Sequence, residues 1–436
     1  MNLLPLAILA DTVPDPHPAM VLPFCTMLLA IALMPIVLKH HWERFYHIIA
    51  LGLGAISVAY YLFVLREPGR VVGVAGDYLS FMALIGSLFV VTSGIHLRVK
   101  GGEAKPWINC VYLLTSAILA NILGTTGASM LMVRPWIRMN KYRYTSLHTV
   151  FFIYIVSNVG GCLTPVGDPP LFLGYLKGVP FWWVLRNCWQ PWAVTMALLL
   201  AAFYALDRLN FLRAPREVRT METSQPETWK FEGLGNLLFL GTILAAVFLP
   251  GGFREVVMVL SAVASYKFTR PAIRQANDFT FGPIKEVGWL FIGIFATMVP
   301  VLDYLQLHSM ELGIDTQGKY FWLTGMLSGV LDNAPTYLTF AAAAFGRFSL
   351  HLDNPAHVAQ FLAGHGRYLV AISTGAVFFG SLTYIGNGPN LMVKAIAEHS
   401  KVHTPNFFSY VIRFSVPVLI PIFTIVWLLF FASPSP

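Results

Sequence analysis

Charged residues are scarce in this sequence. Asp, Glu, Lys and Arg make up 11% of its 436 residues, whereas apolar residues make up 56% and the mean hydropathy is +0.65. This balance excludes an ordinary water-soluble domain. The four cysteines are spread through apolar segments without CxxC spacing, so we expect buried free thiols and no disulfide or zinc site.

Motifs of several other protein classes are also missing. The first sixteen residues carry no basic region, so we expect no cleaved signal peptide. There is no P-loop for nucleotide-driven transport, no HExxH motif, and no Ser, His and Asp set at one depth for hydrolysis. We therefore expect neither an enzyme nor an organic cofactor. The net charge of +8 comes from loop residues and suits an anionic lipid surface better than nucleic acid.

Apolar runs long enough to cross a lipid bilayer are what the sequence does contain. We predict ten spans, at residues 21–38, 46–65, 78–97, 145–175, 181–206, 234–249, 255–268, 287–305, 368–396 and 407–432. Two further apolar segments, 107–137 and 320–345, have polar or helix-breaking residues at their centres. Each is predicted to form a re-entrant hairpin, since non-helical backbone survives at membrane depth only inside protein or beside a watery cavity. The predicted fold class is an all-α polytopic membrane protein.

Basic residues flank the first hairpin on both sides, and the positive-inside rule places them in the cytoplasm. With alternating spans, most other lysines and arginines also fall inside, and both termini fall outside. We expect a multi-pass protein of a bacterial inner membrane.

The span order contains an internal repeat. Spans one to five, in residues 1–206, and spans six to ten, in residues 233–436, each hold one hairpin after the third span. Because five is odd, the second half would enter the membrane from the opposite side, as an inverted repeat. The stretch "LTPVGDPP" at 163–170 aligns with "LTYIGNGP" at 382–389, and the hairpin tips align at Asn121 and Asn333. Residues 207–232 between the halves are predicted to be a cytoplasmic linker.

The aligned stretches interrupt spans 145–175 and 368–396 with glycine and proline. Proline removes a helical hydrogen bond and glycine lets the backbone leave the helix, which frees carbonyl oxygens and half-helix ends for a hard cation such as sodium. Discontinuous helices at the midplane and the hairpin tips would then form one polar pocket. The residues expected to bind an ion or substrate there are Asn121, Thr125, Ser157, Asn158, Thr164, Gly167, Asp168, Asp332, Asn333, Thr336, Thr383, Asn387 and Asn390.

Two acids, Asp168 and Asp332, lie in this predicted pocket. A charged carboxylate near the bilayer centre costs about 2.5–3.5 kcal/mol or more, so intramembrane acids usually mark an ion pathway. Burial favours the protonated acid and a bound cation favours the carboxylate, so one group can exchange a proton for sodium. Both are proton-coupling candidates. Asp332 could instead cap the second half of its hairpin, and Asp168 could lie at a helix end near water. Asp303 is predicted to be interfacial.

The stretches "SNVGGCLTPVGDPP", "SGVLDNAPT" and "GSLTYIGNGPN" resemble the signature breaks of the ion transporter superfamily. Within it, the sequence is most similar to NhaD-type sodium/proton antiporters and to a related citrate transporter group. The resemblance implies a homodimer with a scaffold domain and a transport domain that moves as an elevator. It also implies two sodium sites, the first at Asn121, Ser157, Asn158 and Gly160, and the second at Asn333, Thr383, Gly386 and Asn387.

The hairpin tips depart from one branch of that superfamily. Its dicarboxylate transporters show Ser-Asn-Thr at both tips, whereas the tips here read "ANI" and "DNA". An aspartate at the second tip would repel a dicarboxylate unless a metal or proton masked it. We therefore expect a secondary transporter that exchanges sodium or lithium for protons. The alternative is sodium- or proton-coupled transport of citrate or another di- or tricarboxylate, including a metal complex. A channel would need a continuous pore, and paired hairpins from opposite leaflets argue against one.

Overall fold

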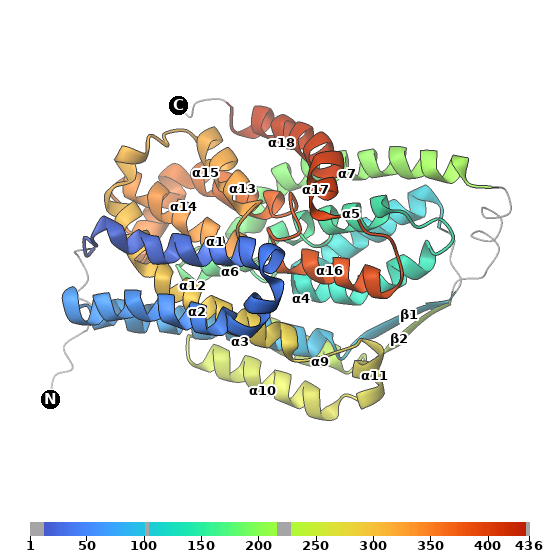
Figure 1. Ribbon diagram of the computed structural model, residues 1–436, viewed down its shortest axis with the longest axis horizontal. Coiled ribbons are helices and arrows are strands. Elements are labelled where there is room, and N and C mark those ends of the chain that lie inside the picture. Colours follow the sequence, from blue (N-terminus) through green and yellow to red (C-terminus); the bar gives the residue numbers. More distant parts are fainter. Residues whose placement is uncertain (1–12, 101–103, 216–227, 433–436) are drawn as a thin grey trace.

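The chain folds almost entirely into helices. The structure is a computed structural model that describes residues 13–100, 104–215 and 228–432, and the one sheet in these ranges is a two-stranded ribbon. Eight helical segments of the described chain are long and apolar enough to cross a membrane. The prediction of an all-α polytopic membrane protein is therefore confirmed (Figure 1).

The first half of the chain runs from a short 3-10 turn to one long helix. Its elements are η2 (Pro18–Val21), α1 (Leu22–Val37), α2 (Lys39–Ala59) with the π-helical turn η3 (Tyr60–Val64), α3 (Pro68–Thr92), β1 (His96–Lys100), α4 (Pro106–Met139), α5 (Ser146–Ile155), the 3-10 turn η4 (Val159–Leu163), α6 (Pro169–Leu176) and α7 (Phe181–Arg213).

The second half begins with a strand and ends with an apolar helix. Its elements are β2 (Thr228–Glu232), α9 (Asn236–Ala246), α10 (Phe253–Phe268), α11 (Pro271–Ala276), α12 (Gly282–Leu307), the 3-10 turn η5 (Ser309–Leu312), α13 (Gln317–Ser328), α14 (Asn333–Arg347), α15 (Pro355–Phe379), α16 (Gly388–His399), α17 (Phe407–Ser409), the π-helical turn η6 (Tyr410–Ser415) and α18 (Val416–Phe430).

Several boundaries differ from those predicted. The span expected at 78–97 ends at Thr92, and the chain continues as β1, which pairs antiparallel with β2. The predicted linker 207–232 starts inside α7 and ends in β2, while 216–227 lies outside the described residues.

Three of the ten predicted spans are not among the eight long apolar helices. At 234–249 and 255–268 the helices are only 11 and 16 residues long, short of the roughly 20 that a bilayer requires. The span expected at 368–396 is split between α15 and α16, and α15 begins earlier, at Pro355, with a non-helical residue at His365. The eighth long segment is α4, which the sequence predicted as a hairpin.

The helices pack in two groups, and each half of the chain contributes to both. Helices α1, α2, α3, α9, α10 and α12 contact one another, and α4 to α7 with α13 to α18 form the second group. The main contacts between the groups are those of α12 with α14 and of α3 with α4 and α6. This division gives each half three helices in the first group, as the predicted repeat requires. The inverted-repeat relation itself stays a prediction.

Both segments predicted to be hairpins fold back on themselves. In α4, which we call hairpin 1, the Tyr112 hydroxyl donates to the carbonyl of Met132 at 2.7 Å, whereas twenty residues of straight helix would separate them by about 30 Å. In hairpin 2, formed by α13 and α14, the rings of Tyr320 and Phe340 are 6.4 Å apart.

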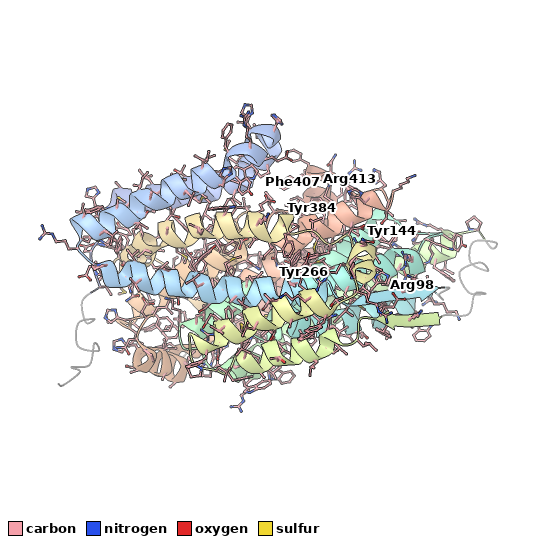
Figure 2. The ribbon with its side chains drawn as sticks, turned by 90° about the horizontal axis from the view of Figure 1, so that it is seen from below. Arg98, Tyr144, Tyr266, Tyr384, Phe407 and Arg413 are labelled. Atoms are coloured by element: carbon pink, nitrogen blue, oxygen red, sulfur yellow. The ribbon has the colours of Figure 1, made fainter. Side chains whose placement is uncertain are left out.

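The two hairpins lie toward opposite ends of the molecule. Hairpin 2 occupies the left part of Figure 1 and hairpin 1 the right. Arg98 and Tyr144, which flank hairpin 1 in the sequence, lie at the right-hand end in Figure 2. The placement of the hairpins in a membrane, and hence their re-entrant character, stays a prediction.

Candidate ion-binding site

The tip of hairpin 1 is made by one glycine. Gly124 has φ +73° and ψ 156°, a conformation that glycine adopts without the strain of a Cβ atom. The turn brings the amide of Thr125 to within 2.8 Å of the carbonyl oxygen of Gly167 in the break between α5 and α6. The side chain of Asn121 makes the same connection from the other side of the tip, because it donates to the carbonyl of Gly160 at 2.7 Å and accepts from the amide of Leu163 at 2.9 Å.

The interrupted spans owe their geometry to proline. Asp168 precedes Pro169, and Asn387 lies two residues before Pro389. Both are extended, with φ/ψ of −139°/140° and −155°/138°, and each is the N-cap residue of the helix that follows. A residue directly before proline, as Asp168 is, is pushed out of the helical region. Asn387 is extended as the N-cap residue of α16, and both Pro169 and Pro389 lie in the first turn of their helices, where proline is tolerated. The two breaks therefore place a carboxylate and an amide at the starts of α6 and α16, where helix dipoles favour negative charge.

Asp168 is fully buried and bonded to the three other broken elements. Its Oδ1 accepts from the Thr125 hydroxyl of hairpin 1 at 2.9 Å and from the Asn387 amide at 3.1 Å. Its Oδ2 accepts from the Asn333 amide of hairpin 2 at 2.6 Å. One carboxylate therefore joins both hairpin tips and both interrupted spans. The structure thus brings together four residues that the sequence predicted to share one pocket.

A second layer of amides surrounds this carboxylate. Asn387 also donates to the carbonyl of Ser157 at 3.1 Å and to Oδ1 of Asn158 at 3.2 Å. Asn158 donates to Oδ1 of Asn390 at 2.8 Å, and Asn390 donates to the carbonyls of Gly380 and Thr383. All three asparagine side chains are buried, so these bonds fix the relative position of the two interrupted spans.

Close backbone contacts within each break repeat between the halves. A Cβ at Gly167 would lie 2.2 Å from the carbonyl oxygen of Gly161, and one at Gly386 would lie 2.7 Å from that of Gly380. These two pairs are separated by the same 219 residues that separate Asp168 from Asn387. Glycine is required at these positions because two backbone segments touch there. Gly161 and Gly380 were not predicted, although the aligned stretches contain the signal when extended by two residues.

Asp332 makes a different contact from Asp168. Its Oδ1 accepts from the amide of Ala334 at 3.0 Å, so it caps α14, the structural alternative that the sequence left open. The next residue, Asn333, donates to Asp168, while its own Oδ1 is buried with no hydrogen-bond partner in the structure. A buried oxygen without a donor is costly unless something else coordinates it, and a cation can do so.

The remaining predicted residues bond mainly to backbone. Thr164 donates to the carbonyl of Asn121, and Thr336 donates to the carbonyl of Asp332. Thr383 accepts from the amides of Ile385 and Gly386. The hydroxyl of Ser157 lies 2.8 Å from that of Ser129, a residue of hairpin 1 that the sequence reasoning missed. These contacts stabilise the breaks and tips, and whether any of these residues binds sodium stays a prediction.

Two acids occupy environments that the sequence did not predict. Asp303, expected at the interface, is fully buried, accepts from the Tyr61 hydroxyl at 2.6 Å and pairs with Arg70. Asp207, expected in a polar linker, is fully buried at the end of α7 and pairs with Arg143. Ion pairing with an arginine distant in sequence explains both, and spacing along the chain gives no signal for such a partner. The thiols of Cys162 and Cys188 are free and buried as expected, whereas the free Cys25 is exposed.

Comparison with known proteins assigns the chain to a family. Residues 15–431 match the sequence model of a family described as "Putative citrate transport". The uncharacterized transporter Rv2685 of Mycobacterium tuberculosis (strain ATCC 25618 / H37Rv) is 22% identical over 349 residues, which cover 74% of this chain and 79% of that protein. The uncharacterized transporter Rv2684 of the same strain is 22% identical over 321 residues, covering 70% and 71%. The chain is therefore a multi-pass membrane protein that belongs to this citrate-transport family of transporters.

Proposed function

We propose that this protein is a secondary transporter that exchanges sodium or lithium for protons at Asp168. The observation that carries the proposal is a buried carboxylate that joins all four broken elements and has no lysine, arginine or histidine partner among the described residues. A buried carboxylate without a countercharge is costly. Either a proton or a bound cation removes that cost, and the two compete for the same group.

The surrounding atoms suit a hard cation. Oxygen ligands are what such ions prefer, and this site offers the carboxylate of Asp168, the hydroxyl of Thr125 and the unpartnered Oδ1 of Asn333. The amides of Asn333 and Asn387 now direct nitrogen toward Asp168, and rotation of either amide would present its oxygen instead. The residues that hydrogen-bond to the Asp168 carboxylate can therefore also contact an ion beside it.

We further propose that the second helical group moves against the first. Asp168 lies wholly within the second group, whose contacts to the first are confined mainly to α12, α14, α3, α4 and α6. A rigid shift of that group would carry the site across the membrane without breaking its hydrogen bonds. As the family resemblance implies, we propose that the protein works as a homodimer in a bacterial inner membrane.

Proton flux in proteoliposomes tests the proposal. Vesicles with an internal pH dye receive a pulse of sodium or lithium chloride outside, and choline chloride is the control. The wild-type protein should change the internal pH only with sodium or lithium, and Asp168→Asn should abolish the change. Asp332→Asn is the matched acid substitution: asparagine caps a helix as well as aspartate does, so a loss of flux in this variant would assign coupling to the charge of Asp332.

Carboxylate transport is the second candidate function, because the description of the family that matches residues 15–431 names citrate transport. Among the described residues no cationic side chain contacts Asp168, so an anionic substrate at this site would need a bound sodium, proton or metal to offset the aspartate. Uptake of radiolabelled citrate or succinate into the same vesicles separates the candidates. Saturable uptake, with no pH response to sodium or lithium, would reject antiport.

A further inference from the structure

A basic cavity lies away from Asp168, on the face predicted to be cytoplasmic. Its volume is about 870 Å³, within the range of small-molecule binding pockets. The second half of hairpin 1, the connection from α11 to α12, and α16 form its walls. Its charged lining residues are Arg134, Arg138, Lys141 and Asp278.

The three cationic residues come from the end of hairpin 1 and the turn that follows it. Arg134 and Arg138 are four residues apart on one face of α4, and Lys141 lies in the turn after the helix ends at Met139. Arg134 donates to Asp278 at 2.8 Å through Nη2, whereas its Nη1 is buried with no hydrogen-bond partner. In the part of the chain that the structure describes, no carboxylate lies within ion-pair distance of Arg138 or Lys141. The cavity therefore has excess positive charge and at least one buried donor without an acceptor.

One aromatic side chain lines both the basic cavity and a smaller cavity beside the central site. Phe89 of α3 lines the basic cavity and also a smaller one of about 40 Å³ at the tip of hairpin 1. That smaller cavity is lined by Gly124, Thr125 and Gly167, and Thr125 donates directly to Asp168. Its volume is enough for a water molecule but not for an organic anion. Phe89 is buried and packs against Phe279 at 5.5 Å between ring centroids, so the ring is fixed where it contributes to the wall of both cavities.

We infer that the basic cavity binds a small anion that carries two or more carboxylate or phosphate groups. Arginine pairs with such groups through parallel N–H donors, and the unpartnered Nη1 of Arg134 supplies one of them. Arg138 and Lys141 supply further positive charge at the mouth of the cavity, where both are exposed. The inference deepens the second candidate function, carboxylate transport. It rests on that candidate only for the further step in which a bound anion moves past Phe89 toward Asp168. Anion binding in the cavity does not require transport.

Titration calorimetry of the purified full-length protein tests the inference, with citrate and inorganic phosphate as probes at low and high salt. Citrate should bind, more weakly at high salt, and Arg138→Gln should lower its affinity about tenfold or more. Arg138 makes no ion pair among the described residues, so this variant should fold normally. Arg138→Lys should recover part of the affinity. Lys267→Gln, an exposed residue of α10 outside the cavity, is the matched control and should bind citrate as the wild type does.

The source of the anion is distinguished by repeating the titration in nanodiscs. Citrate binding that persists with phosphatidylglycerol present identifies a free anion as the ligand. Binding that is lost only when phosphatidylglycerol is present identifies the phosphate of a lipid headgroup. Absence of citrate binding in neutral nanodiscs, or equal affinity in Arg138→Gln and the wild type, would overturn the inference. Asp168→Asn should bind citrate normally while its sodium response is lost, so failure of the cavity and failure of the proposed antiport are separate results.

Discussion

Replacing Asp168 by asparagine separates the charge of this residue from its hydrogen bonds. In the structure both carboxylate oxygens act only as acceptors, for the Thr125 hydroxyl and for the amides of Asn333 and Asn387. Asparagine keeps one acceptor oxygen and replaces the other with a donor. On the Oδ2 side that donor would face the amide nitrogen of Asn333, but the amide can rotate and present its unpartnered Oδ1.

The expected magnitude follows from counting donors that lose their acceptor. After rotation of Asn333, the Asp168→Asn variant leaves about one buried donor unpaired, which costs about 1–3 kcal/mol. Removal of a buried charge offsets part of that cost, so the net change in unfolding free energy should stay within about 2 kcal/mol. Asp168→Ala removes the acceptor of all three donors, but Asn387 keeps Ser157 and Asn158 as partners. Two buried donors, those of Thr125 and Asn333, are then left unpaired, so this variant should destabilise the protein by about 2–6 kcal/mol.

Thermal unfolding in detergent, followed by tryptophan fluorescence, measures the relative stability of the two variants. Asp168→Asn should unfold near the wild-type temperature and Asp168→Ala well below it, while both lose the sodium-triggered pH change in vesicles. Equal unfolding temperatures for the two variants would refute the assignment of three hydrogen bonds to Asp168. Full sodium-dependent flux in Asp168→Asn would show instead that the carboxylate bonds correctly but carries no ion or proton.

Two other predictions concern packing and pH. Gly386→Ala should destabilise the fold by about 1–3 kcal/mol, because its Cβ would lie 2.7 Å from the carbonyl oxygen of Gly380. Gly388→Ala is the control and should not destabilise the fold, because the space around this residue is open. Thermal unfolding of the two variants checks this prediction, and equal unfolding temperatures would contradict the close contact at Gly386. Burial raises the pKa of Asp353, but its ion pair with Lys177 at 2.5 Å helps to hold that pKa below its usual range. The stability that Asp353 contributes should therefore be present at pH 7 and should decrease as the pH falls below about 4, the usual pKa of an aspartate, until the lowered pKa of the folded state is passed. Asp353→Asn should unfold earlier than the wild type at pH 7, and this difference should narrow as the pH is lowered below about 4. An unfolding difference that does not change between pH 7 and about pH 2 would argue against this pairing.

Local sequence determined the positions where the spans break. Gly124 turns hairpin 1, Pro169 forces the extended backbone of Asp168, and Pro389 lies in the first turn of the half-helix after Asn387. These are effects of one or two residues on their own backbone, so they can be read without the fold. Composition likewise fixed the membrane class, because 56% apolar residues leave too little polar surface for a soluble protein.

Helix boundaries were less predictable where apolarity and secondary structure diverge. The predicted span 78–97 extended past Thr92, where α3 ends, and into β1, which begins at His96. This strand forms because β2, more than 120 residues later, supplies its hydrogen-bond partner. Similarly, α15 extends to Pro355 through a polar segment that hydropathy excluded from the span. In both cases a partner or a cap outside the apolar run decided the boundary.

Only the tertiary structure decided what each acid does. Asp168 and Asp332 occupy similar sequence contexts beside proline-containing breaks, yet the first receives three side-chain hydrogen bonds and the second caps its own helix. The difference depends on donors from three other elements that converge on Asp168. Their convergence results from packing between segments that are 43 to 219 residues apart in the sequence. The sequence by itself determined which residues could bind an ion, because chemistry and backbone freedom are local. The fold determined which of these residues meet, because the distance between two side chains depends on the packing of the whole chain and not on local sequence.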